Sequence, residues 1–158
     1  MNKHYTLQTS CRDAKLNDKA TMLGHAAMVM AGCRRSSGFQ IRTLYYWLAP
    51  AIEHAQIIML FDSTCAPRGF LIWAHLAPDT EQRLLQDPNF LLHPSEWNEG
   101  GRAWVIDFCF PGGAVKEALS MLRQHLREAG IDQISWVRRR ADYSIRRIGS
   151  CRTEKKTR

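Results

Sequence analysis

A single acidic residue interrupts the most apolar stretch of this chain. Between Ala103 and Phe110 the sequence reads A-W-V-I-D-F-C-F, and Asp107 is the one residue there that is not apolar. The stretch is too short for a typical helix and rich in aromatic and β-branched residues, which predicts a buried strand. Because a carboxylate inside such a strand is costly without a partner, we expect other groups to pair with Asp107.

The strand is followed by the breaker segment Pro111-Gly112-Gly113 and then by a helical pattern over Ala114–Ala129. A glycine loop before a helix can present backbone N–H groups to an anion. The segment lacks the lysine and the spacing of a P-loop, however, so a tight turn that needs glycine is the simpler interpretation.

Among six histidines, His25 is the most unusual candidate partner for Asp107. It follows Gly24 inside a predicted helix, where glycine costs ~1 kcal/mol relative to alanine. We take this glycine as a sign of close approach to the backbone beside His25. Histidine with aspartate is the standard general-base pair, because imidazole titrates near neutrality and the carboxylate fixes its tautomer. The alternatives are a structural histidine and a structural acid that is bonded to Arg102 or to backbone N–H groups.

The remaining pattern predicts one α+β domain that comprises residues 1–158, a length that supports a single core. A helix is expected at 19–31, after an N-cap at 17–18, and further helices at 78–86 and 114–129. Strands are expected at 41–48, 56–61, 70–76, 103–110, 131–137 and 143–148. The second and third of these form an antiparallel hairpin, and the order predicts a mostly antiparallel sheet that is flanked by helices.

The net charge of +7 is concentrated in a basic C-terminal segment, residues 138–158. Residues 1–137 hold 13 basic and 13 acidic residues, whereas residues 138–158 hold 9 basic residues and 2 acidic ones. Such a segment attracts nucleic acid, anionic lipid or an acidic protein. A solvated tail is the alternative.

The five cysteines are odd in number and contain no C-x-x-C pair, which argues against a zinc site and a disulfide framework. No metal is expected, and a cysteine–histidine nucleophile stays an open alternative. The sequence has no run near the ~20 apolar residues of a membrane span. It also lacks the apolar core of a signal peptide. We therefore expect a cytoplasmic protein with reduced thiols.

Four sequence segments carry a resemblance when they are taken together and in order. They are L-G-H at 23–25, L-A-P-A-I at 48–52, W-A-H-L at 73–76, and W-N-E-G-G-R-A-W-V-I-D-F at 97–108 with Pro111 behind it. Over residues 20–137 the chain resembles a distant member of the RTX toxin-activating lysine acyltransferases. The resemblance implies a GNAT-like fold without a bound cofactor. It also implies transfer of a fatty acyl group from acyl carrier protein to internal lysines of an RTX-type protoxin.

The resemblance assigns roles to individual residues. The family's essential histidine and aspartate fall on His25 and Asp107, the two residues that already stood out. Arg102 matches the family arginine ahead of the acidic strand, which implies positioning or an anion contact. Gly112 and Gly113 are then expected in the cleft for the pantetheine arm of the carrier.

The chain departs from the family pattern behind the histidine. The segment Gly32–Arg34 replaces an Asn-Ser-Pro that lines the site in the family, so Cys33 is expected as a substrate contact. Met28 and Met30 stand where the family has tryptophans, and Ser36 stands where it has a histidine.

In the implied reaction His25 either accepts the proton of the lysine amine or carries the acyl group as a transient nucleophile. The basic segment is then a candidate dock for acyl carrier protein, and nucleic acid is the less favoured partner. Apolar strands and methionine-rich helix faces permit a homodimer, which the resemblance also favours. Two other readings stay open: a GNAT-like acyltransferase with a non-toxin acceptor, and a non-catalytic basic module that binds nucleic acid or membrane.

Overall fold

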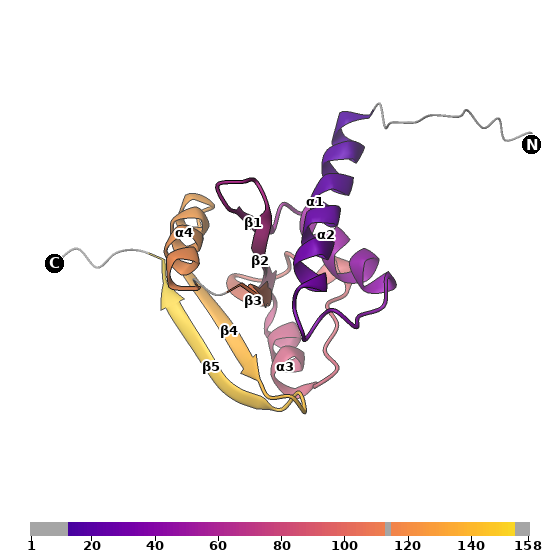
Figure 1. Cartoon of the computed structure of the whole chain (residues 1–158). Helices are drawn as coiled ribbons and strands as arrows, with labels where there is room; N and C mark the ends of the chain where they lie inside the picture. Colours follow the sequence, from indigo (N-terminus) through magenta and orange to yellow (C-terminus); the bar gives the residue numbers. More distant parts are fainter. Residues whose placement is uncertain (1–12, 113–114, 154–158) are drawn as a thin grey trace, which may run out of the picture.

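The computed structural model describes residues 13–112 and 115–153 of the chain (Figure 1). Its helical elements are α1 (Ala14–Ala31), the π-helical turn η1 (Leu44–Leu48), α2 (Ala49–Glu53), α3 (Pro78–Gln86), the 3-10 turn η2 (Pro94–Glu96) and α4 (Val115–Glu128). Its strands are β1 (Ile57–Phe61), β2 (Pro67–Leu76), β3 (Arg102–Cys109), β4 (Gln133–Arg139) and β5 (Ile145–Arg152). Among the described residues no helix has the length and apolar character that crossing a bilayer requires.

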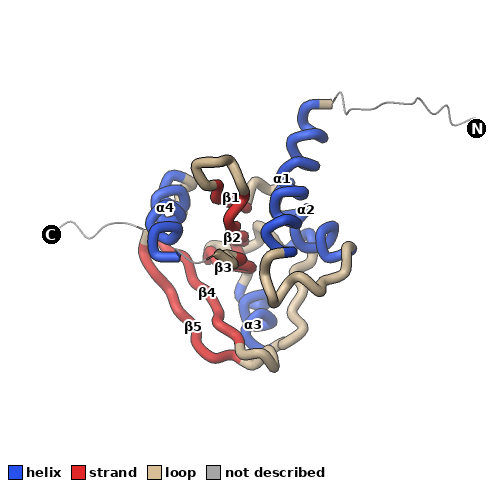
Figure 2. The backbone as a smooth tube through the Cα atoms, in the orientation of Figure 1, coloured by secondary structure: helices blue, strands red, loops and turns tan. Residues whose placement is uncertain are grey.

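The five strands form one sheet in the order β1-β2-β3-β4-β5, in which only the β3–β4 pair is parallel. The predicted α+β class with a mostly antiparallel sheet is confirmed, and the arrangement is compatible with a GNAT-like fold. The parallel pairing joins only Ala103 to Ile134 and Trp104 to Ser135. Beyond these residues the β4–β5 hairpin swings away from the other strands (Figure 2). The sheet is therefore split at the ends of β3 and β4.

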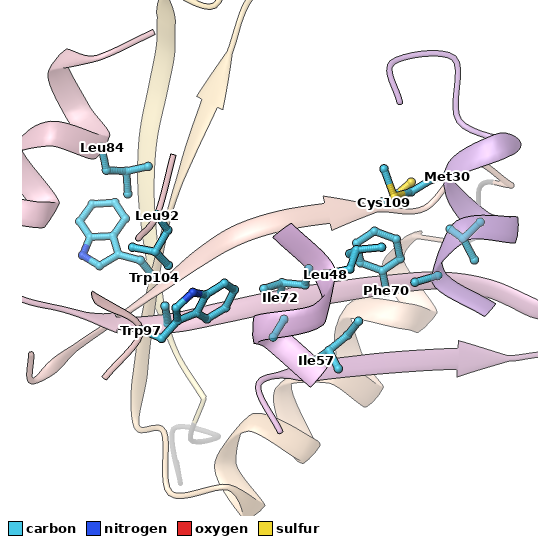
Figure 3. Packing of buried hydrophobic residues seen from close by; sticks show 14 of the residues in the cluster. Met30, Leu48, Ile57, Phe70, Ile72, Leu84, Leu92, Trp97, Trp104 and Cys109 are labelled. Atoms are coloured by element: carbon cyan, nitrogen blue, oxygen red, sulfur yellow. The ribbon is translucent and has the colours of Figure 1, made fainter. Parts of the chain in front are cut away.

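Helices cover both faces of the sheet, with α1 and α2 on one side and α4 on the other (Figure 1). Successive side chains of a strand point to opposite faces, and β2 follows this rule. Phe70 and Ile72 belong to the cluster under α1 and α2, which Figure 3 shows, whereas Leu71 and Trp73 pack with the α4 cluster. The central strands are thus buried on both sides, as their apolar composition predicted.

Helix α1 begins five residues earlier than predicted. Its N-cap is Asp13, whose carboxylate accepts the N–H of Leu16 at 2.9 Å, and not the predicted pair at 17–18. The N–H of Asn17 already donates to the carbonyl of Asp13 at 2.9 Å, inside the first turn. Both positions carry good cap residues, so the local sequence did not discriminate between them.

The predicted strand at 41–48 is wrong, because this segment forms the turn η1 and continues directly into α2. Pro50 is the second residue of α2, directly behind the π-helical turn. It therefore continues the helical segment that it was expected to end. The aromatic and leucine residues favour a strand locally, but the fully buried Leu48 packs in the cluster under α1.

Residues 138–153 of the basic segment do not form a tail, although most of them are exposed to solvent. This stretch holds the end of β4 and all of β5, while residues 154–158 lie outside the described residues. Arg138 lies directly opposite Arg147 in the hairpin. Like charges in such a pair repel each other, so a sheet that keeps them gains no stability from the arrangement.

We predict that Gly100 is required for the fold and that its neighbour Gly101 is not. A Cβ atom at Gly100 would overlap the backbone carbonyl of Leu76, whereas one at Gly101 would meet no atom within 4 Å. Gly100→Ala is expected to lower the free energy of unfolding by about 1–3 kcal/mol, because the backbone has to shift. Urea denaturation of Gly100→Ala beside the control Gly101→Ala measures this, and equal midpoints would contradict it.

Candidate active site

A β-bulge in β3 decides which way Asp107 points. Ile72 of β2 lies opposite Asp107 and the next residue, Trp73, lies opposite Val105, so Ile106 has no partner in the register. Strict alternation would place Asp107 on the same face as Val105, which packs in the α4 cluster. The extra residue puts it on the face of Ile72, beneath α1. Bulges commonly re-aim a side chain in this way beside functional sites.

The Asp107 carboxylate accepts three hydrogen bonds, and its side chain is only 13% exposed. Oδ1 accepts from the Arg35 guanidinium and from the backbone N–H of Phe108, both at 2.8 Å. Oδ2 accepts from the indole N–H of Trp47 at 3.2 Å. These donors satisfy the acid that the sequence left without a partner.

His25 does not make the predicted pair with Asp107: within the described part of the chain, no hydrogen bond joins the two residues. The half-buried imidazole of His25 lies edge-on to the ring of Phe61 in β1, with the ring centroids 5.1 Å apart. A Cβ atom on Gly24 would meet nothing within 4 Å, so the described chain makes no close approach there. The catalytic roles of His25 and Asp107 stay predictions. In place of the expected contact with His25, Asp107 contacts Arg35 and Trp47.

The split between β3 and β4 contains a pocket of about 440 Å³. Its wall is mainly apolar and comes from the sheet and from α4, with Leu71, Val105, Leu119, Leu122, Leu126 and Ile134 among the lining residues. Asp107, Phe108 and Arg35 line the same pocket. The volume lies in the range of small-molecule sites, and an apolar wall with charged groups beside it suits an aliphatic chain that carries a polar end.

The lining of this pocket also includes a set of arginines. Arg123 of α4, Arg138 of β4 and Arg146 of β5 contribute to it and have no hydrogen-bond or ion-pair partner among the described residues. Arg139, by contrast, donates to the backbone carbonyls of Leu84 and Asp87. Three cationic groups are therefore available to an anionic ligand beside the pocket.

The other predicted contact residues are spread over the molecule. Arg102 begins β3, where its side chain is 78% exposed and bonds to Glu81 at 3.3 Å. Because Arg102 bonds to Glu81 and not to Asp107, the structure does not bring it to the acid. Gly112 lies in an exposed turn behind β3, and Gly113 lies outside the described residues.

Two residues of the site were missed by sequence reasoning. Trp47 lies in the segment that was taken for a strand, and its role was therefore hidden. Arg35 follows Arg34 in a loop, and nothing local to this pair points to an acid 72 residues away. The described residues contain no group of three or more His, Cys, Asp and Glu side chains that could hold a metal ion.

Comparison with known proteins supplies the family. Residues 15–151 match the HlyC family model, which is described as the RTX toxin acyltransferase family. The chain belongs to the RTX toxin acyltransferase family. The resemblance that the four sequence segments indicated is thereby confirmed, and with it the assignment to a family of acyltransferases.

Three relatives illustrate the distance within this family. The RTX-II toxin-activating lysine-acyltransferase ApxIIC of Actinobacillus pleuropneumoniae is 31% identical over 72% of this chain and 67% of its own length. The leukotoxin-activating lysine-acyltransferase LtxC of Aggregatibacter actinomycetemcomitans is 31% identical over 61% of this chain and 56% of its own. The protein-lysine myristoyltransferase RtxC of Kingella kingae is 27% identical over 70% and 63%. The matched region thus spans between about half and two thirds of the length of these relatives.

In this member of the RTX toxin acyltransferase family, Cys33 and Cys109 lie next to the Arg35–Asp107 pair. The Ser36 hydroxyl lies 3.9 Å from Cys109 Sγ, and the two thiols contact each other. Burial raises the pKa of Cys109 to about 12, and Cys33 adds to this effect. Burial also acts to raise the pKa of Cys33, but hydrogen bonds from the Ser36 hydroxyl, the Arg35 backbone and Cys109 outweigh it and lower that pKa.

We predict that alkylation distinguishes the two thiols. A lowered pKa gives Cys33 more thiolate than an ordinary cysteine at a given pH, and the thiolate is the reactive form. The buried Cys109 reaches half ionisation only near pH 12. Brief iodoacetamide treatment near neutral pH, followed by peptide mass spectrometry, should label Cys33 first, while the denatured protein labels at both. Faster labelling of Cys109 in the folded protein would contradict this order.

Proposed function

We propose that this protein is a protein-lysine fatty acyltransferase that uses acyl carrier protein as donor and an RTX-type protoxin as acceptor. The observation that carries the proposal is the apolar pocket in the β3–β4 split, which has a carboxylate, Asp107, among its lining residues. The activities in the names of the relatives, lysine acylation in ApxIIC and protein-lysine myristoylation in RtxC, give the acceptor group and an acyl class that such a pocket suits.

In the reaction the lysine nitrogen attacks the thioester carbonyl, so that a carbon–nitrogen bond forms and the carbon–sulfur bond breaks. A lysine with a pKa of about 10.4 is protonated near neutral pH, and its proton has to leave before attack. His25 is assigned as the proton acceptor, or as a nucleophile that carries the acyl group between donor and lysine. On becoming an amide the lysine nitrogen loses two protons in all: one is released to solvent, and the other stays with the departing carrier thiol. We place the reaction in the cytoplasm, where the four described cysteines, all free, would stay reduced.

The charges around the pocket indicate how the acyl donor, acylated carrier protein, would bind. The phosphate of a pantetheine arm and the acidic surface of a carrier protein both need cationic contacts, and Arg123, Arg138 and Arg146 are available for them. An acyl chain within the apolar wall would contribute about 0.8 kcal/mol for each buried methylene group. We therefore limit the docking site for acyl carrier protein, predicted on the whole basic segment, to the part of β4 and β5 that lines the pocket.

We predict that His25→Ala and Asp107→Asn each lower the rate of acyl transfer by about 10²–10⁴-fold, the contribution of a positioned acid–base group. The assay supplies acylated carrier protein and a lysine peptide and follows amide formation by mass spectrometry. His125→Ala, on an exposed position of α4, is the matched control. Near-wild-type transfer by either variant, with circular dichroism unchanged, would sink the assignment of that residue.

Carrier binding is predicted to depend on the arginines that line the pocket. Arg138→Glu and Arg146→Glu should each weaken binding of acylated carrier protein at low salt, and the difference from wild type should shrink as salt screens exposed charges beyond ~10 Å at 0.1 M. Arg152→Glu makes the same charge change at the other end of β5, where it pairs with Gln133, and serves as control. Equal dissociation constants for all three variants would overturn this placement of the donor.

A further inference from the structure

Two oxygen atoms of β3 bind one nitrogen of Arg35. Nη2 of this guanidinium lies 2.8 Å from Asp107 Oδ1 and 3.4 Å from the backbone carbonyl oxygen of Phe108. A carboxylate oxygen and a carbonyl oxygen that converge in this way form a small site for a cationic nitrogen.

The position of this cation site follows from the split sheet. In an antiparallel pair, the N–H and C=O of one residue point to the same side of the strand. The N–H of Phe108 donates to Asp107 Oδ1 and not to β2, so its carbonyl also lies at the open edge of β3. This edge has a strand partner only at Ala103 and Trp104. The cation site consequently lies where β4 has turned away and the apolar pocket begins.

Of the three donors to Asp107, only Arg35 is easily exchanged. The N–H of Phe108 belongs to the strand itself, and the Trp47 indole is part of the half-buried packing beneath α1. The Arg35 side chain extends from the turn at 34–38 and is 63% exposed. The arginine end of this ion pair is open to solvent, where a charged partner contributes little net stability, so another cation can displace Arg35 at little cost.

We infer that Asp107 Oδ1 and the Phe108 carbonyl form the subsite for the ammonium group of the acceptor lysine, and that Arg35 fills this subsite when no acceptor is bound. The inference rests on the proposed acylation of lysine. An ammonium group has three donors and no acceptor, which suits two converging oxygens. Bound there, the lysine nitrogen stands beside the pocket that would hold the thioester. Arg35 then acts as an internal competitor of the acceptor and so sets how strongly an acceptor has to bind.

The first experiment measures the subsite without any acyl transfer. The probe is n-butylammonium, which has the length of a lysine side chain, and its binding is followed by NMR titration of the full chain. Arg35→Ala should bind the probe more tightly than wild type by up to about fivefold, the factor that one exposed ion pair represents. Arg34→Ala, the neighbouring arginine with no partner among the described residues, should bind as wild type does, and Asp107→Asn should not bind.

The second experiment uses acylated carrier protein and a lysine peptide. Arg35→Ala should lower KM for the peptide by up to about fivefold and leave KM for the carrier unchanged, while Arg35→Lys, which keeps a competing cation, should stay near wild type. If Arg35→Ala binds the probe no tighter than wild type, or raises KM for the peptide, the inference is wrong. If wild type transfers no acyl group while the probe still discriminates the variants, the subsite stands and the proposed function fails.

Discussion

A carboxylate that is largely shielded from water in an apolar strand has to keep its hydrogen bonds, and three separate parts of this chain meet to provide them. The loop after α1 supplies Arg35, the π-helical turn supplies Trp47, and β3 supplies the N–H of Phe108. The bulge at Ile106 makes these contacts possible, because it turns the Asp107 side chain away from α4. Leaving such a group unpaired would cost several kcal/mol at least. The acid therefore ties the helical layer to the sheet at the same place where it lines the pocket.

The fold was predictable where the pattern that encodes it is local. The helix expected at 78–86 has these bounds, and both strands of the first hairpin were found, because strand alternation and turn residues are read over a few positions. The segment before Pro50 was assigned wrongly because its tyrosine, tryptophan and leucine residues are good strand formers in isolation. Its helical state depends on packing of Leu48 and Trp47 beneath α1, which no window of the sequence contains.

The candidate site was predictable only in part, for a related reason. Asp107 could be found because it conflicts with its own neighbours, which is visible in the sequence alone. Its partners Arg35 and Trp47 lie 72 and 60 residues away and come close only through the sheet and the helices around it. Arg102 was expected near the acid because it matches the family arginine, yet an extended chain of about 3.3 Å per residue carries it towards Glu81 instead.

The β4–β5 hairpin is fastened at two places and spans the pocket between them. Its base is held by the short ladder at Ile134 and Ser135, and its far end is held by Arg139, which donates to the carbonyls of Leu84 and Asp87 beside α3. A span that is fixed at both ends behaves as an arch rather than as a flap. The depth of the pocket is then set by the bulk of the side chains that line it, Trp136 among them, and not by how far a lid can open.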